Sequence, residues 1–184
     1  GTFSAMNILG EKEDGTILVN DVLPRSRLVY LFQKIAVGLL GGILSAGLTA
    51  LVCIRPLRMI QLPGLTAVIL LSAFLASLAG AFTGRAAEGL MVGIGLLKLV
   101  MIGFIAPPIL FWLLLPAGSR GNGLACLVPS VPAFRGIMEL LEGGSFPAVY
   151  ILLLSVHCVV WLAVYLWTEM AGEKRKRCKG GKLA

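Results

Sequence analysis

Long apolar stretches separated by short polar breaks form the dominant pattern of this chain of 184 residues. A helix needs about 20 mainly apolar residues to cross a bilayer. Four stretches have that length and composition: Lys34–Ile54, Leu62–Gly84, Leu90–Leu115 and Pro147–Thr168. None of them alternates apolar and polar residues, as transmembrane β-strands do. The pattern therefore predicts an all-α fold, a polytopic bundle with four full membrane-spanning helices.

The segments around these spans complete a single transmembrane domain over residues 1–184. Residues 1–10 are apolar but too short to cross the bilayer, and we interpret them as the end of a preceding helix in an N-terminally truncated chain. Residues 11–33 form a polar loop, residues 116–146 an outer segment, and residues 169–184 a basic tail. The outer segment contains a helical pattern at 133–141, expected to lie on the membrane surface, with a gate or outer cap as the alternative.

Composition supports a membrane protein and gives an orientation. Hydrophobic residues make up 58% of the chain and charged residues only 14%, with a mean hydropathy of +0.93. If the spans alternate, eleven Lys and Arg residues lie on the side of the polar loop and the tail, against four on the other side. The positive-inside rule then places the polar loop and the C-terminus in the cytoplasm, in a multi-pass protein of the cell (inner or plasma) membrane.

The net charge of +7 does not require a nucleic-acid partner. The basic tail has no interleaved aromatic residues, and we expect it to lie against anionic lipid. Trp167 and Tyr165, shortly before the tail, are expected to form an aromatic belt at the inner membrane interface.

The sequence offers no machinery for catalysis or cofactor binding. It lacks the G-x-x-x-x-G-K-[ST] pattern that cradles nucleotide phosphates and the H-E-x-x-H pattern of zinc proteases. The four cysteines are too far apart for a zinc or redox motif. The only histidine, His157, has no carboxylate in its span, which favours a packed, hydrogen-bonded group over a metal ligand. We therefore expect no enzyme activity, no metal and no cofactor on this chain.

The third span contains the chain's candidates for a transport pathway. Lys98 is an ionisable residue inside an apolar span, and such residues are functional candidates by default. Snorkelling to the membrane surface or a structural ion pair is the simpler interpretation, and contact with a substrate is the alternative. Pro107 and Pro108 are expected to kink or break this helix, since proline lacks the amide donor that continues a helix.

The polar loop carries the most specific pattern in the chain. It consists of E-K-E-D-G-T at 11–16, P-x-S-R at 24–27, then Tyr30 and Lys34. This pattern resembles the cytoplasmic loop of type-2 ABC exporter permeases, membrane subunits that typically have six spans. The resemblance extends over most of the chain, and the motifs of the first loop are the part that is specific to the family.

The resemblance implies a dimeric membrane domain, with a second permease copy or a homologue, that works with a separate ABC ATPase subunit. That subunit would bind ATP and Mg²⁺ and drive export. The residues implied to couple the loop to the ATPase are Glu11, Lys12, Glu13, Asp14, Gly15, Thr16, Pro24 and Arg27. The acidic residues would face basic groups of the ATPase, while Gly15 would permit a tight turn. The apolar spans suggest a hydrophobic or amphiphilic substrate; a membrane scaffold that transports nothing is the alternative function.

Overall fold

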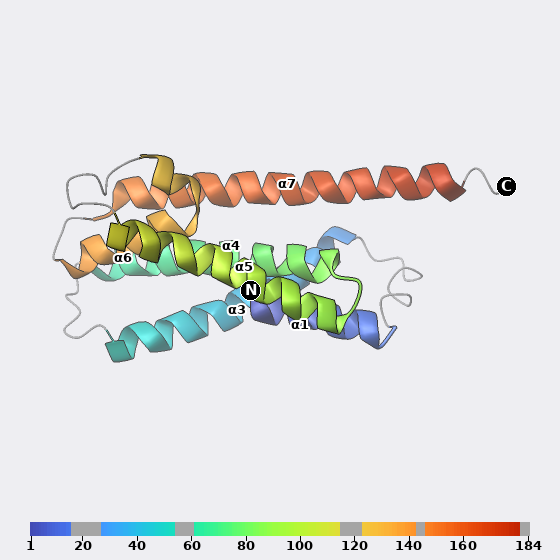
Figure 1. The fold of residues 1–184 in the computed structure, drawn as a ribbon, viewed down its shortest axis with the longest axis horizontal. Helices are drawn as coiled ribbons and strands as arrows, with labels where there is room; N and C mark the ends of the chain where they lie inside the picture. Colours follow the sequence, from blue (N-terminus) through green and yellow to red (C-terminus); the bar gives the residue numbers. More distant parts are fainter. Residues whose placement is uncertain (16–26, 54–60, 115–122, 143–145, 181–184) are drawn as a thin grey trace.

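All regular structure in the described residues is helical. The computed structural model describes residues 1–15, 27–53, 61–114, 123–142 and 146–180. Over these ranges the chain forms α1 (Thr2–Glu13), α3 (Arg27–Cys53), α4 (Leu62–Ala86), α5 (Leu90–Leu114), the short 3₁₀-helix η3 (Gly123–Leu127), α6 (Ser130–Leu141) and α7 (Ala148–Gly180) (Figure 1). The prediction of an all-α fold is confirmed.

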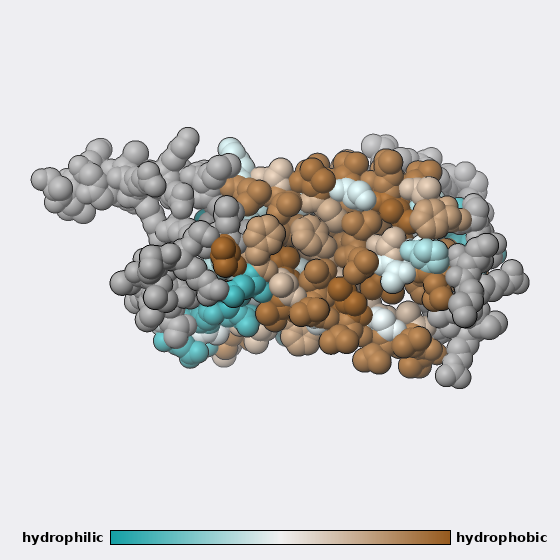
Figure 2. Space-filling model, turned by 180° about the vertical axis from the view of Figure 1, so that it is seen from behind, coloured by the Kyte–Doolittle hydropathy of each residue, from teal (hydrophilic) through white to brown (hydrophobic). Residues whose placement is uncertain are grey.

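Four of these helices are long and apolar enough to cross a membrane. Their apolar segments are Phe32–Val52, Leu62–Ala86, Leu90–Leu114 and Ala148–Thr168, within two residues of the predicted spans. Figure 2 shows the corresponding band of hydrophobic surface, with hydrophilic residues gathered near the end of the bundle from which α7 projects. The chain is therefore a multi-pass membrane protein.

The helix α4 lies at the centre of the bundle. It contacts α1, α3, α5, α6 and α7. Its Leu78 is fully buried beside Ile8, Ile35 and Tyr165, and its Val68 is fully buried beside Leu154. Because lipid tails are as apolar as these side chains, close packing rather than escape from water holds such helices together.

Glycines provide the close packing that seats α1. A Cβ atom at Gly84 of α4 would lie 3.0 Å from Ile8 Cβ and 3.2 Å from Ala5 Cα, so α1 and α4 approach closely there. Gly93 of α5 likewise receives the side chain of Leu9. Small residues allow such approaches between helices in lipid, and α1 is consequently held by α3, α4 and α5 together.

Two predicted details differ from the structure. The polar loop is shorter than residues 11–33, because α1 continues through Glu13 and α3 already begins at Arg27. The helix α5 is continuous through Pro107 and Pro108, so these residues do not break it. Prolines are tolerated in membrane helices, where neighbouring groups compensate the missing backbone bonds.

The helix α6 packs into the bundle instead of only covering its surface. It contacts α4, α5 and α7, and Gly136 lies so close to α4 that a Cβ atom there would meet the Val68 side chain at 3.3 Å. Gln61, just before α4, donates a hydrogen bond to the carbonyl oxygen of Leu140 at 2.8 Å. These contacts hold α6 against three membrane-spanning helices, and its expected position at the membrane surface stays a prediction.

Candidate functional site

One end of the bundle gathers the polar residues that the sequence singled out. Here α1 and α4 end and α3 and α5 begin, and α7 passes the same end on its way to Gly180 (Figure 1). We refer to it as the loop end. Alternation of the spans predicted this grouping, because each crossing returns the chain to the opposite end.

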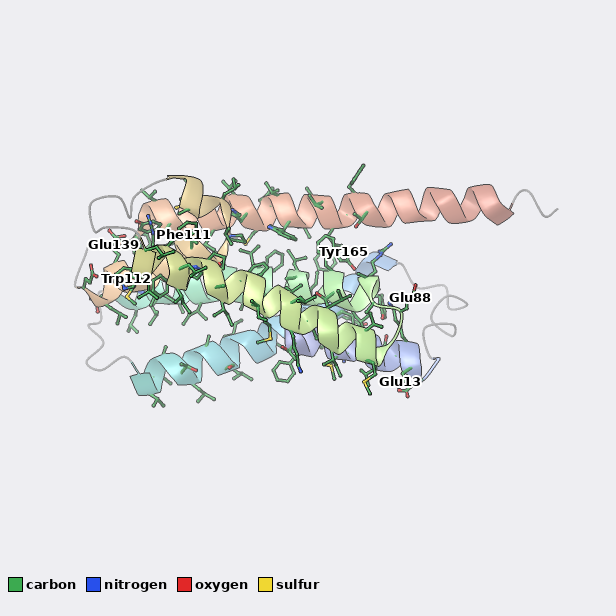
Figure 3. All side chains as sticks on the ribbon, in the orientation of Figure 1. Glu13, Glu88, Phe111, Trp112, Glu139 and Tyr165 are labelled. Carbon is green, nitrogen blue, oxygen red and sulfur yellow. The ribbon has the colours of Figure 1, made fainter. Side chains whose placement is uncertain are left out.

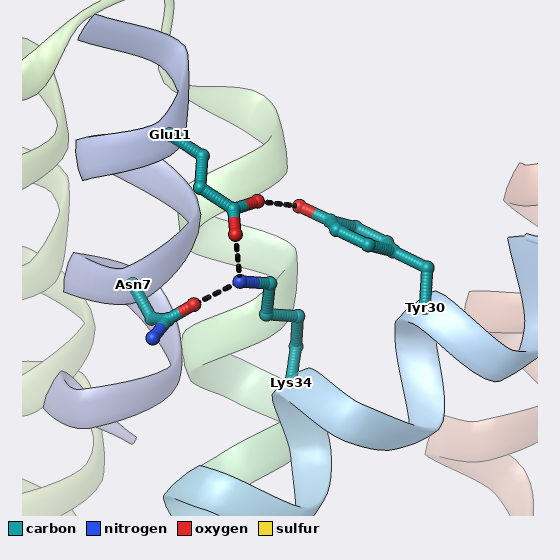
Figure 4. A network of polar contacts seen from close by, with 4 residues as sticks. All are labelled: Asn7, Glu11, Tyr30 and Lys34. Atoms are coloured by element: carbon teal, nitrogen blue, oxygen red, sulfur yellow. Dashed lines mark hydrogen bonds and ion pairs between the residues drawn. The ribbon is translucent and has the colours of Figure 1, made fainter. Parts of the chain in front are cut away.

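Four side chains at the loop end form a connected polar cluster, which we call the polar joint: Asn7, Glu11, Tyr30 and Lys34. The Lys34 ammonium donates to Asn7 Oδ1 and forms an ion pair with Glu11 Oε1 (Figure 4). The Tyr30 hydroxyl donates to the other carboxylate oxygen of Glu11 at 2.5 Å. The polar joint thus ties the C-terminal part of α1 to the beginning of α3.

Helical spacing explains why these four residues meet. Asn7 and Glu11 are four residues apart on α1, and Tyr30 and Lys34 are four apart on α3, so each pair lies on one face of its helix. The Lys34 ammonium also lies 5.2 Å from the centre of the Tyr30 ring, within range of a cation–π contact.

Burial makes the pairing of Lys34 important. Its side chain is 9% exposed, whereas that of Glu11 is 28% exposed. A buried charge is tolerated when it is paired and hydrogen-bonded. Burial, followed by the hydrogen bond to Glu11, raises the pKa of Tyr30, so its hydroxyl remains a donor well above its usual titration range.

A second set of hydrogen bonds extends the α1–α3 contact deeper into the bundle. The fully buried Ser4 hydroxyl lies 3.2 Å from the carbonyl oxygen of Lys34, to which it donates, and 3.0 Å from Ser77 Oγ. Ser77 of α4 in turn donates to the carbonyl oxygen of Ile35 at 2.8 Å. These hydrogen bonds join α1, α3 and α4 at the same depth along the bundle.

Lys12 fastens the end of α1 to the end of α4. Its ammonium donates to the carbonyl oxygens of Arg85 at 2.8 Å and Ala87 at 2.6 Å. Such carbonyls at a helix C-terminus carry partial negative charge and suit a cation. Burial lowers the pKa of Lys12, and the positive charge of Arg85 lowers it further. Adjacent residues of α1 therefore fix it to two different helices, Glu11 to α3 and Lys12 to α4.

Other acidic residues at the loop end face outward. Glu13, Asp14 and Glu88 are exposed, and Figure 3 shows Glu13 and Glu88 at this end, far from Glu139 at the opposite end. Directly after Asp14, Gly15 has a φ of +69°, the left-handed conformation that glycine adopts without strain at a helix C-terminus. The predicted turn at Gly15 is confirmed.

Thr16 and Pro24 lie outside the described residues, and Arg27 is the first residue of α3. Asn7 and Ser4 were not predicted from the sequence as site residues. The spacing of Asn7, one helical turn before Glu11, would have been the signal once residues 1–13 were known to form one continuous helix.

The pathway candidates on α5 lie apart from the polar joint. Lys98 is exposed and makes no ion pair or hydrogen bond with the described part of the chain. Pro108 is buried within the bundle, and Pro107 is partly buried.

His157 and Tyr165 of α7 are both engaged within the protein. The ring nitrogens of His157 lie 2.8 Å from the Leu153 carbonyl oxygen and 3.1 Å from that of Leu127, which confirms a packed, hydrogen-bonded histidine. Tyr165 is 4% exposed and its ring meets that of Phe82 edge-on at 4.8 Å. Its predicted place in an interfacial aromatic belt is therefore wrong, because it turns toward α4.

These features define a helical membrane protein whose short first helix is fixed between three spans, with a polar cluster at one end. A family described as fluoroquinolones export permease protein Rv2686c-like matches residues 1–167, and the chain belongs to this family. No curated protein and no solved structure matches the chain. The family agrees with the resemblance to ABC exporter permeases, and the classes of export permease and multi-pass membrane protein are confirmed.

Proposed function

We propose that this chain is the membrane-spanning subunit of an ATP-driven exporter that moves a hydrophobic or amphiphilic compound out of the cytoplasm. A separate ABC ATPase subunit binds ATP and Mg²⁺, and a second permease copy or homologue completes the membrane domain. The family's description as an export permease for fluoroquinolones supports this assignment and suggests planar aromatic drugs as substrates.

The observation that carries the proposal is the polar joint. A permease driven by another subunit needs a part that receives movement at the surface and passes it to the spans. Here the last turn of α1 is bonded to α3 through Glu11 and to α4 through Lys12. A displacement of this turn therefore moves two membrane-spanning helices together, because direct hydrogen bonds and an ion pair join them.

Within this proposal the acidic residues have two different roles. Glu13, Asp14 and Glu88 are exposed and available to basic groups of the ATPase. Glu11 is a positioning residue, because its carboxylate is engaged by Lys34 and Tyr30. The loop end lies in the cytoplasm together with the C-terminus, as the distribution of Lys and Arg suggests.

The test uses the permease with its ATPase subunit in proteoliposomes. We expect Glu13→Lys combined with Asp14→Lys to lower permease-stimulated ATP hydrolysis at least about tenfold, corresponding to about 1.4 kcal/mol of lost interaction. The fold should remain intact, since lysine at a helix C-terminus is favourable for the helix dipole. The matched control is Glu142→Lys, also an exposed acid after a helix but not at the loop end.

Two results would count against the proposal in different ways. Unchanged stimulation in the double variant would move the ATPase contact away from the end of α1. If no P-loop subunit copurifies with the wild-type permease and none is stimulated by it, the scaffold function replaces the transporter function.

A further inference from the structure

The exposed face of α5 is apolar except for one cation. Residues that recur every three or four positions along it are exposed to the outside of the bundle. They are Met91, Gly95, Lys98, Ile102, Ile105 and Ile109. Since this spacing follows one side of a helix, we call these six residues the α5 stripe.

Lys98 lies outside the contact between α5 and α1. Its neighbour Leu97 is buried at 7% exposure, and Gly93, one turn earlier, receives Leu9 of α1. Consecutive residues are about 100° apart around a helix, so Lys98 points away from the side that α1 covers. Lys98 therefore lies on the outer surface of the bundle and not in its interior.

Space is open on the stripe beside Lys98. Side chains of a helix lean toward its N-terminus, which directs the lysine stem over Gly95. A Cβ atom at Gly95 would meet nothing within 4 Å. A molecule lying on the α5 stripe can consequently approach the lysine without moving any described residue.

The position of Lys98 within the span makes an opposite charge beside it favourable. It lies eight residues after Leu90, the start of the span, which is about 12 Å along the helix. Ionisable groups at such depth are costly unless they face water or an opposite charge. The described part of the chain supplies no such charge, although it does so for the buried Lys34.

We propose that the α5 stripe is a substrate contact surface on which the Lys98 ammonium pairs with the carboxylate of an aromatic acid. The inference rests on the proposed export function and names the residue that recognises the acid group of its substrate. Fluoroquinolones, which the family description mentions, have this chemistry: a planar ring system bearing a carboxylate. The carboxylate meets the ammonium in the open space over Gly95, and the ring packs against the neighbouring apolar residues of the α5 stripe.

The test compares the transport of norfloxacin with that of its ethyl ester, which keeps the ring and removes the negative charge. The permease and its ATPase subunit are reconstituted in proteoliposomes, and ATP-dependent transport of each compound is measured. We expect the wild type to show a KM at least about tenfold lower for the acid. This is the size of effect that one partly hydrated ion pair provides.

Substitutions on α5 identify the group responsible. Lys98→Met should raise the KM for the acid to that of the ester and leave the ester unchanged, whereas Lys98→Arg should retain the preference. The matched control is Leu99→Met, also on the exposed surface of α5 but about 100° away around the helix. Its preference for the acid should equal that of the wild type.

The outcomes separate this inference from the function on which it rests. If both compounds are exported and the acid has no advantage, or keeps it in Lys98→Met, the inference is wrong while the export function stands; Lys98 then only snorkels to the membrane surface. If neither compound is transported, substrate assignment and inference fail together. Copurification and stimulation of the ATPase independently test whether the chain is an exporter subunit at all.

Discussion

The ion pair in the polar joint leads to an asymmetric prediction. Glu11→Ala leaves the Lys34 ammonium, 9% exposed, without its carboxylate, although Asn7 still accepts one hydrogen bond. Breaking a buried pair by removing one partner costs roughly 3–5 kcal/mol. Because Asn7 remains and Glu11 itself is partly hydrated, we expect the lower end, about 3 kcal/mol of unfolding free energy.

Removing the other partner should cost less. Lys34→Met replaces the cation by an apolar side chain of similar length, and it leaves a carboxylate that is 28% exposed and still accepts from Tyr30. We expect a loss of about 1 kcal/mol, the size of an ordinary hydrogen-bonding contribution. The double variant should lose little more than Lys34→Met alone, about 1 kcal/mol, which gives a coupling energy of about 3 kcal/mol between the two residues.

The assay is reversible unfolding in mixed micelles, followed by tryptophan fluorescence. Glu88→Ala serves as the control, because Glu88 is an exposed acid at the same end and should stay within about 0.5 kcal/mol of the wild type. The reasoning is refuted if Glu11→Ala costs no more than Lys34→Met, or if the two losses simply add. Either result would mean that Lys34 is well solvated without Glu11.

Three further predictions concern packing, backbone conformation and pH. Gly84→Leu should destabilise the protein by at least about 3 kcal/mol, since even a Cβ atom lies 3.2 Å from Ala5 Cα, whereas Gly47→Leu, with open space around it, should be nearly neutral in the same unfolding assay. Gly15→Ala should cost about 1 kcal/mol, because its φ of +69° strains any residue with a Cβ; equal stability would show that the turn rearranges freely. Above about pH 10, the usual pKa of tyrosine, the unfolded chain loses a proton that folded Tyr30 retains, so wild-type stability should fall with rising pH more steeply than that of Tyr30→Phe; parallel pH profiles of the melting temperature would contradict this.

The four spans could be predicted from the sequence because the bilayer constrains their length and composition directly. Each predicted span begins and ends within two residues of the helical segment found in the structure. The same constraint predicted which connections share an end of the bundle. It did not predict that α7 continues as a helix to Gly180, about 18 Å beyond the end of its apolar segment at Thr168.

The sequence was less informative about how helices turn toward one another. Tyr165 was expected in an aromatic belt at the membrane interface and packs on α4 instead, and the contacts of α6 with α4, α5 and α7 were not predicted. Both packing arrangements depend on the shapes of neighbouring helices that are distant in the sequence. Hydrophobicity alone cannot distinguish a side chain facing lipid from one facing protein, since both surroundings are apolar.

The polar loop illustrates the same division most clearly. The pattern of residues 11–34 by itself singled out this region as a candidate site, and it included Glu11, Tyr30 and Lys34 together. Only the tertiary structure separated the roles of Glu11 and Glu13. These residues are two positions apart and therefore about 200° apart around α1, so when Glu11 faces α3 and binds Lys34, Glu13 must face outward. The sequence determined which helices cross the membrane, whereas the rotation of α1, which packs against glycines of α4 and α5, decided which acid binds Lys34 and which is exposed.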